Sequence, residues 1–394
     1  PAAGHVVYLA LTMRKCVVCR KACVLSLGLV SAVYAHEKIF YRIVSPVGSG
    51  ITALSADGAV IAWTNAATDA VTCAVQRASS LAPADWRDFV RHEATNTAVR
   101  LRLGDRAAPA DMVYIPAGSF EMGIDEGAAY NPSEAPLHWV YVSAFYMAQT
   151  EVTWAQWRAV YDWAVTNGYT FTNAGGGKAA DHPAHTLNWF DAIKWCNARS
   201  EMEGLPVCYF TNVTQTLVYR SGQAVPSVAW RTGGYRLPTE AEWEKAARGG
   251  PAGLRFPHGD TITHADANFY SDAKYANYDF SDPRGYHPAY NDGVPPYTSP
   301  VGSFAPNGFG LYDMGGNILE WCWDWSGSYY PVSPYLDPRG PDTGSFRVLR
   351  GGSWLRDASC LRVVDRNNTA NPTYNGGASN RHFGFRVVRS ATEE

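Results

Sequence analysis

Signals for regular secondary structure are scarce in this sequence, and their scarcity limits the folds open to the chain. Between residues 112 and 390 only three runs have helical periodicity with a start and a stop signal, and the remainder is loop-like with short β-like runs. The chain contains 36 Gly and 24 Pro among 394 residues, which favours turns. A core of this kind needs side-chain networks, aromatic packing or bound ions. We therefore expect neither a helix bundle nor a doubly wound parallel sheet.

The three helices are predicted from their own capping patterns. The stretches 153–156 and 239–242 match the Ser/Thr-x-x-Glu/Gln capping box, and a third run spans 189–203. Each run ends at a glycine, namely Gly168, Gly204 or Gly249. The 189–203 run places four apolar residues near one face: Phe190, Ile193, Ala198 and Met202.

Composition excludes several classes of protein and partner. With 46% hydrophobic and 18% charged residues, the chain resembles a packed globular protein and not a disordered one. The net charge is −3 and no block of Lys and Arg forms a basic stripe, so nucleic acid is not an expected partner. The 14 Trp and 23 Tyr indicate aromatic platforms that could line a ligand site.

The N-terminal region, residues 1–35, resembles a secretory signal peptide. From Met13 the sequence has basic residues, then an apolar run over 22–33, then a small residue at Ala35. This run is too short to span a bilayer comfortably, so no permanent membrane span is expected. Two alternatives stay open, a buried N-terminal element and lipid attachment at Cys23. We expect an exported protein, which could be periplasmic, secreted or at the cell surface.

Two folded domains should follow the leader. Residues 36–108 alternate apolar and polar in short runs broken by turn residues, which predicts a small all-β module. The stretch 104–111 is poor in bulky apolar residues and contains Pro109, so the boundary is placed there. A larger domain then spans 109–394.

Six motifs in the larger domain carry a resemblance to a known family. They are Met112–Gly123 (MVYIPAGSFEMG), Tyr235–Glu244 (YRLPTEAEWE), Asn307–Asn317 (NGFGLYDMGGN), Glu320–Trp321 (EW), Arg350–Trp354 (RGGSW) and Gly384–Arg386 (GFR). In this order they resemble the formylglycine-generating enzyme family, also called the sulfatase-modifying-factor family. The resemblance implies an irregular, loop-rich α+β fold of the C-type lectin type, preceded here by the small all-β domain.

The resemblance also implies structural calcium. Its first site would use the side chains of Asp313 and Glu320 with the carbonyls of Gly316 and Ile318. Its second site would use the side chains of Asn268 and Asp292 with the carbonyls of Phe269 and Val294. Paired carboxylates around a Gly-rich turn suit a hard cation, although the same residues could simply cap turns.

Catalytic residues are where this sequence departs from the family. Formylglycine-generating enzymes oxidise a substrate cysteine with a copper ion held by two cysteines a few residues after Gly-Gly-Ser. Here only Cys360 is present, Arg356 lies near the position of the first cysteine, and Leu319 replaces the usual Trp. Ser353 matches an active-site serine. Because two soft thiolates are needed to hold Cu(I), copper and oxidase activity are not expected.

Two other branches of the superfamily have functions that the sequence can be compared with. Sulfoxide-forming members hold non-haem iron with histidines of an added helical domain, but only His36 and His92 occur between the leader and the boundary. Variable proteins of diversity-generating retroelements display a ligand site built from the C-terminal segment. Adenine-directed mutagenesis of Asn codons cannot yield Lys, Glu, Gln, Met or Trp, and none of these occurs from Leu355 to Arg386.

Two functional hypotheses therefore stand. The first is an exported, non-catalytic protein that binds a protein or glycan on its C-terminal loops, and the second is a divergent copper-dependent formylglycine-generating oxidase. In the first, the ligand-binding side chains should reach solvent, because their polar groups could not all find partners in a core. The predicted ligand-binding residues are Trp354, Leu355, Arg356, Asp357, Asp365, Asn367, Asn368, Thr369, Tyr374, Asn375 and His382.

Overall fold

The chain forms two compact units, Pro1–Ala107 and Ala108–Glu394. The computed structural model describes seven strands in the first unit and most of the second. The described residues are 5–10, 40–45, 49–54, 60–65, 71–78, 87–94, 98–102, 108–125, 132–250, 253–327, 335–366, 369–374 and 381–391.

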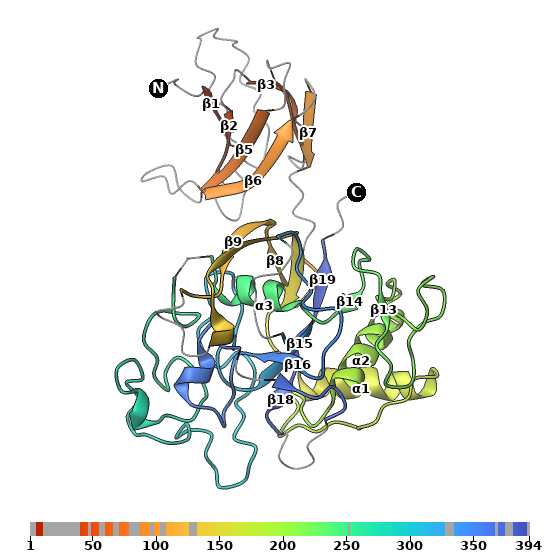
Figure 1. The fold of residues 1–394 in the computed structure, drawn as a ribbon, viewed down its shortest axis with the longest axis vertical. Coiled ribbons are helices and arrows are strands. Elements are labelled where there is room, and N and C mark those ends of the chain that lie inside the picture. Colours follow the sequence, from red (N-terminus) through yellow and green to blue (C-terminus); the bar gives the residue numbers. More distant parts are fainter. Residues whose placement is uncertain are drawn as a thin grey trace, which may run out of the picture. The chain divides into compact units, whose positions relative to one another are not determined.

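The described part of the first unit consists of strands in two antiparallel sheets. One sheet has the order β1-β2-β5-β6 and the other β3-β4-β7 (Figure 1). The strands are β1 (His5–Ala10), β2 (Phe40–Ser45), β3 (Ser49–Leu54), β4 (Val60–Asn65), β5 (Val71–Ala78), β6 (Arg87–Ala94) and β7 (Ala98–Arg102). Strand β1 falls within the region 1–35 assigned to a signal peptide. The rest of that region lies outside the described residues.

The second unit has short strands in several small sheets instead of one large sheet. Two sheets have four strands, in the orders β14-β19-β11-β8 and β17-β16-β15-β18, and β10-β9 and β12-β13 form pairs. The bounds are β8 (Met112–Ile115), β9 (Gly118–Met122), β10 (His138–Val142), β11 (Phe145–Ala148), β12 (Tyr209–Phe210), β13 (Ser227–Val228), β14 (Tyr235–Arg236), β15 (Leu319–Trp325), β16 (Arg347–Arg350), β17 (Thr369–Ala370), β18 (Phe383–Gly384) and β19 (Val388–Ser390). This confirms the irregular α+β class.

The three predicted helices are all present, and two of them begin at the predicted caps Thr153 and Thr239. They are α1 (Trp154–Thr166), α2 (Trp189–Met202) and α3 (Glu240–Ala247). Short 3₁₀ turns lie elsewhere in the unit: η2 (Pro132–Glu134) before α1, and η3 (Ala273–Tyr275) and η4 (Ala358–Leu361) after α3. Thr153 and Thr239 close capping boxes with Gln156 and Glu242. A third capping box, formed by Asn188 with Asp191, opens α2. The caps satisfy backbone N–H groups that a helix terminus otherwise leaves unpaired. None of the helices in the described residues is long and apolar enough to cross a membrane.

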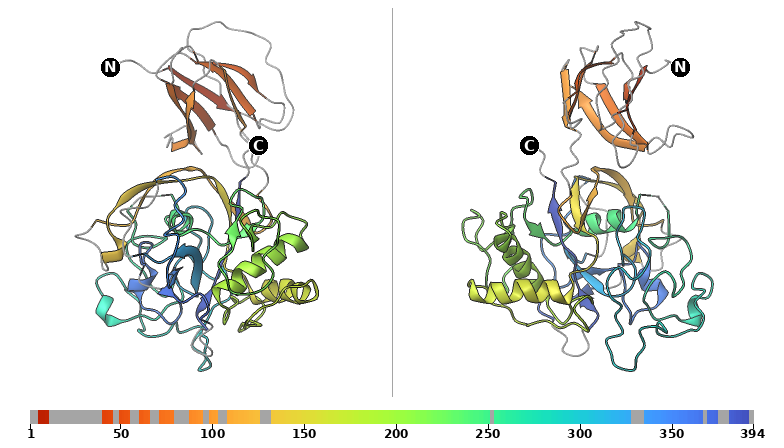
Figure 2. Two further views of the ribbon diagram at one scale, coloured as in Figure 1. Left: turned by 45° about the vertical axis from the view of Figure 1, so that its right-hand side comes forward. Right: turned by 180° about the vertical axis from the view of Figure 1, so that it is seen from behind.

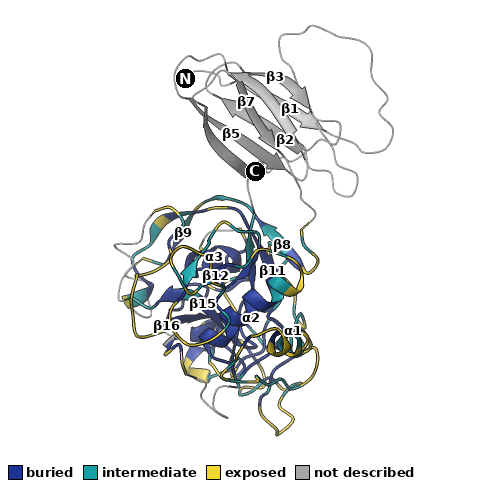
Figure 3. Ribbon diagram, turned by 90° about the vertical axis from the view of Figure 1, so that its right-hand side faces the viewer, coloured by how far each residue is buried: buried dark blue, intermediate teal, exposed yellow. Residues whose placement is uncertain are grey.

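Burial differs between the helices in a way that the sequence pattern does not show (Figure 3). Helix α1 buries one stripe, whereas all eight residues of α3 and most of α2 are buried. The polar residues Asp191, Lys194 and Asn197 of α2 lie inside with the apolar ones, while Met202 is 38% exposed. The single apolar face predicted for this helix is therefore wrong, because neighbouring loops cover its polar side as well.

Aromatic packing joins α1, α2 and the C-terminal segment into the main core. The rings of Trp157 and Trp195 are stacked with centroids 6.2 Å apart, and the edge of Phe385 meets both rings. The two helices lie side by side on one flank of the unit (Figure 2). Burial of such large side chains supplies much of the stabilising apolar contact that short strands cannot provide.

A buried charged network holds the remaining elements together. The Arg350 guanidinium contacts Glu244 and Glu240 of α3, and Arg366 makes a two-pronged ion pair with Glu240. These residues are almost fully buried. Charges in this environment are tolerated only when they are paired and hydrogen-bonded. The expectation that side-chain networks support a loop-rich fold is met here.

Candidate ligand-binding surface of the C-terminal segment

Three neighbouring strands hold both ends of the C-terminal segment. Strand β15 pairs antiparallel with β16, where Glu320 lies opposite Arg350, and parallel with β18, where Glu320 also lies opposite Gly384. The chain between Arg350 and Gly384 therefore leaves and returns at the same place in the sheet (Figure 1). Both predicted anchors lie at strands, as their small residues suggest.

Two glycines permit this close return of the chain. Gly352 has φ +71°, and a Cβ there would lie 2.9 Å from the carbonyl oxygen of Cys360. At Gly384, an added Cβ would lie 2.5 Å from the carbonyl oxygen of Ala184. Neither distance is compatible with a side chain, so both positions require glycine.

A paired carboxylate lies under the segment. Arg386 donates from Nη2 to Glu320 Oε1 at 2.6 Å and from Nε to Glu320 Oε2 at 2.7 Å. The indole Nε1 of Trp243 donates to Glu320 Oε2 at 2.7 Å. All three side chains are buried. This bidentate pair fixes β15 against the C-terminal segment and leaves both Glu320 oxygens occupied.

The predicted ligand-binding residues divide into an exposed and a buried group. Leu355, Arg356 and Tyr374 are exposed, and Asp357 is half-buried and caps η4 by accepting from the Ser359 N–H. Asn367, Asn368 and Asn375 lie outside the described residues, and Thr369 is described only as backbone in β17.

The expected exposure is wrong for three residues. Trp354, Asp365 and His382 are only 5%, 2% and 8% exposed. Trp354 lies under the surface because its indole N–H donates to the Arg381 carbonyl at 3.1 Å. Asp365 lies beside the Arg362 guanidinium, and the ring of His382 packs edge-on against Phe383. The partner of Trp354 lies 27 residues along the chain, so the local sequence does not reveal it.

Two buried histidines lie behind the exposed residues. Burial, and next the Arg356 charge, lowers the pKa of His382 to about 4. Burial, and next the Arg381 charge, lowers the pKa of His185 to about 4. Both imidazoles are therefore neutral at neutral pH, and His382 does not add a positive charge to the surface.

An aromatic cluster completes the surface, and sequence reasoning missed most of it. The Trp354 ring contacts Tyr297 at 5.2 Å and Tyr286 at 5.9 Å between centroids, and Tyr286 contacts Tyr270 at 4.9 Å. The Tyr270 N–H donates to the Arg356 carbonyl at 2.9 Å, which joins the two segments. The high Tyr content of 270–297 was the available signal. We call Trp354, Arg356, Tyr270, Tyr286 and Tyr297 the aromatic surface.

At the first predicted calcium site, the Glu320 carboxylate is already engaged by other side chains. Both oxygens of Glu320 are engaged by Arg386 and Trp243, and Asp313 accepts from the Gly302 N–H at 2.6 Å. Burial, opposed by smaller favourable contacts, raises the pKa of Asp313 to about 6. Gly316 and Ile318 contribute backbone to the same turn. As arranged, Glu320 does not fit a calcium ion.

At the second predicted calcium site, one ligand is free to bind a metal ion and two are already in contact with a lysine. Asn268 Oδ1 is buried without a hydrogen-bond partner, as a metal ligand would be, and the Phe269 side chain is buried in a small apolar cluster. The other two ligands, Asp292 and Val294, are contacted by the Lys178 ammonium. Among the described residues, no group of three or more His, Cys, Asp or Glu is placed to hold a metal ion.

Comparison with known proteins decides the family. The family described as "Sulfatase-modifying factor enzyme 1-like domain" matches residues 102–391. The chain belongs to this family. A formylglycine-generating enzyme of Streptomyces coelicolor is 34% identical over 303 residues, which cover 71% of this chain and 89% of the relative. A "Chaperone protein LppX" of Paenibacillus barcinonensis is 29% identical over 304 residues, which cover 73% of this chain and 92% of the relative.

Solved structures support the same family and its C-type lectin-like fold. "Treponema denticola variable protein 1" matches with a TM-score of 0.53 and 30% identity, covering 71% of this chain and 94% of that one. PvdO from Pseudomonas aeruginosa matches with a TM-score of 0.51 and 28% identity, with the same coverage. The resemblance inferred from the six motifs, including the likeness to variable proteins, is confirmed.

Cys360 and Ser353, the two oxidase residues that the sequence retains, are buried. The Cys360 side chain lies in η4, the residue is 8% exposed, and burial raises the thiol pKa to about 11. Ser353 is fully buried, and its Oγ accepts from the Leu355 N–H at 3.3 Å. A buried, protonated thiol at Cys360 does not fit copper, which needs thiolate ligands.

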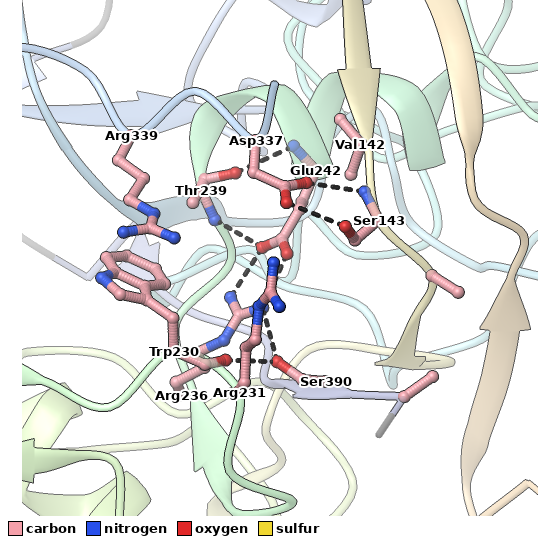
Figure 4. Close-up of a pocket in the computed structure, with 12 residues that line it drawn as sticks. Val142, Ser143, Trp230, Arg231, Arg236, Thr239, Glu242, Asp337, Arg339 and Ser390 are labelled. Carbon is pink, nitrogen blue, oxygen red and sulfur yellow. Dashed lines mark hydrogen bonds and ion pairs between the residues drawn. The ribbon is translucent and has the colours of Figure 1, made fainter. Parts of the chain in front are cut away.

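A separate cavity of about 160 Å³ lies at the start of α3. Figure 4 shows Arg339 over the Trp230 ring, with its guanidinium carbon 4.3 Å from the ring centroid. The carboxylates there are already engaged, since Glu242 pairs with Arg236 and Asp337 accepts from the Ser143 N–H and hydroxyl. None of the residues predicted for ligand, metal or oxidase chemistry lines this cavity.

Proposed function

We propose that this family member is an exported, non-catalytic protein that binds a ligand on its aromatic surface. The observation that carries the proposal is the exposed Arg356, whose carbonyl accepts from the Tyr270 N–H beside the ring cluster of Trp354, Tyr286 and Tyr297. No side-chain hydrogen bond or ion pair of Arg356 occurs among the described residues, so its five donors are available to a partner. The lone, buried Cys360 favours binding over oxidation.

The residue types favour a protein or glycan as the ligand. Trp, Tyr and Arg are the residues that dominate the energetics of protein interfaces, and aromatic rings also stack on sugars. Exposed Leu355 and Tyr374, on the same C-terminal segment, offer further contact area. Glycine-bounded strands hold the segment at both ends, which limits the conformational entropy lost on binding.

A variable C-terminal segment is part of the proposal. The absence of Lys, Glu, Gln, Met and Trp from 355–386, and the likeness to a variable protein, support it. The genomic neighbourhood tests this part. A reverse transcriptase gene beside a near-identical template copy of codons 350–388 is expected, and an adjacent sulfatase gene without such a copy would argue for the oxidase.

Binding is tested with a panel of purified bacterial surface proteins and glycans. The wild-type chain is compared with an Arg356→Ser, Tyr270→Ser double variant, since both side chains are exposed. We expect at least one panel member to bind the wild type and to lose most of its affinity for the variant. Trp139→Ser is the matched control, because Trp139 is 59% exposed on β10 and outside the aromatic surface.

Two results would count against this surface. If the double variant binds every panel member as the wild type does, the aromatic surface is not the site. If Trp139→Ser abolishes binding to the same extent, the exposed apolar residues bind without specificity.

The oxidase alternative is favoured by one observation, the 34% identity to enzymes that generate formylglycine. It requires copper at Cys360 and turnover of a Cys-containing sulfatase peptide. Incubation with copper and such a peptide should leave the thiol mass unchanged. Conversion of the thiol to an aldehyde by the wild type, lost in Cys360→Ser, would replace binding with catalysis as the function.

A further inference from the structure

Lys178 places its ammonium among oxygen atoms of a distant loop. Nζ lies 2.7 Å from Asp292 Oδ2, 3.0 Å from the Pro296 carbonyl oxygen and 3.3 Å from the Val294 carbonyl oxygen. The lysine comes from the connection between α1 and α2, and the oxygens come from the loop after Tyr290. Three oxygens from one loop thus converge on a single positive group.

Two of these oxygens are the ligands that the family resemblance assigns to the second calcium ion. They are the Asp292 carboxylate and the Val294 carbonyl. Calcium needs six to eight oxygens at about 2.3–2.6 Å, and an ammonium in the same position would repel it. The two cations therefore exclude one another at this site.

Hydrogen bonds on both sides of Lys178 fix the backbone that carries it. Backbone hydrogen bonds at 2.8 Å join Gly176 and His185 in both directions, and the Ala155 N–H donates to the Ala180 carbonyl. The Lys178 side chain is only 23% exposed, and its Nζ lies 5.8 Å from the Tyr297 ring centroid. The hydrogen bond to Lys178 is the first cause that lowers the pKa of Asp292.

We propose that Lys178 is a built-in replacement for the second calcium ion. Its ammonium neutralises Asp292 and orders residues 292–296, and Arg381 adds a bond from Nη1 to the Pro295 carbonyl at 2.7 Å. Asn268, whose Oδ1 has no hydrogen-bond partner, is the ligand that the lysine does not reach. The loop beside Tyr297 is therefore ordered without metal. This inference does not depend on whether the aromatic surface binds a ligand.

Thermal melting of the full chain with millimolar calcium or with EDTA tests the replacement. The wild type should melt at the same temperature in both conditions. Lys178→Met should lower the melting temperature in EDTA by about 2–4 °C, since two hydrogen bonds and an ion pair between a partly buried ammonium and an exposed carboxylate are lost. Calcium should restore much of this loss in the variant, because the freed oxygens can then bind the ion.

Two further variants separate this mechanism from a general charge effect. Lys274→Met removes an exposed lysine elsewhere, over the Tyr275 ring, and should show no response to calcium. Asp292→Asn combined with Lys178→Met should lose the calcium response. Calcium titration calorimetry should detect binding to Lys178→Met and none at this site in the wild type.

The proposal is overturned by either of two results. One is a wild type that EDTA destabilises and whose calcium response disappears in Asp292→Asn, which would mean that calcium displaces the lysine. The other is a Lys178→Met variant that melts below the wild type and gains nothing from calcium, which would mean that the lysine is only a loop clamp.

Discussion

The buried pair of Arg386 and Glu320 with the charged residues around β15, which we call the charged floor, and the aromatic surface use arginine in opposite ways. In the floor, Arg386 has both prongs on Glu320, and every atom involved is buried. On the surface, Arg356 is exposed with no side-chain partner in the described residues. A guanidinium whose N–H groups are all bound inside the protein stabilises the fold, whereas one whose N–H groups face solvent can bind a ligand.

The largest expected effect lies in the floor. Arg386→Met should lower the free energy of unfolding by about 3–5 kcal/mol, because it leaves the Glu320 carboxylate buried without its countercharge. Urea denaturation measures it. Adding Glu320→Gln should recover part of the loss, and an equal loss in the single and double variants would mean that packing matters more than charge.

The second largest loss of stability is expected at Gly352, where the C-terminal segment leaves β16. Gly352→Ala should cost about 1–3 kcal/mol from its positive φ, with a further loss because the new methyl would meet the carbonyl oxygen of Cys360 at 2.9 Å. Gly253→Ala is the control, since Gly253 has φ +81° but no atom within 4 Å of the added Cβ. Similar losses at both positions would show that close approach contributes nothing.

The free energy of unfolding should also depend on pH through Asp324, a buried residue of β15. Burial, and next the charge of Glu240, raises the pKa of Asp324 from 3.8 to about 8. The folded state therefore holds a proton that the unfolded state has lost, so this group's stabilisation is complete below pH 4 and disappears as pH rises through about 8.

Asp324→Asn should remove that dependence. The asparagine stays neutral and can still accept from the Glu240 N–H, as Asp324 Oδ2 does at 2.7 Å. The slope lost is at most about 1.4 kcal/mol per pH unit, the value for one proton. Urea midpoints measured from pH 5 to 8 give this slope, and an unchanged slope in the variant would place the titrating group elsewhere.

The smallest effect on stability is expected on the surface. Arg356→Ser should change the free energy of unfolding by less than about 0.5 kcal/mol, because no side-chain contact is lost. The same variant should weaken ligand binding. A loss of stability comparable with that of Arg386→Met would remove the contrast between the two regions.

Local sequence determined the elements whose signals are local. Thr153 and Thr239 mark the starts of α1 and α3 because a cap needs only a side chain three residues from its N–H partner. The glycines at 351, 352 and 384 mark a crowded backbone because only glycine tolerates it. Six short motifs were enough to recognise the family.

Tertiary structure alone decided which side chains meet across long separations. Trp354 was predicted to be exposed but is buried, and its indole N–H donates to the carbonyl of Arg381, 27 residues along the chain. Tyr286 and Tyr297 reach Trp354, and Lys178 reaches Asp292, only because loops without periodic signals converge in space. Such contacts depend on the path of the whole backbone, whereas caps and tight turns depend on a few adjacent residues.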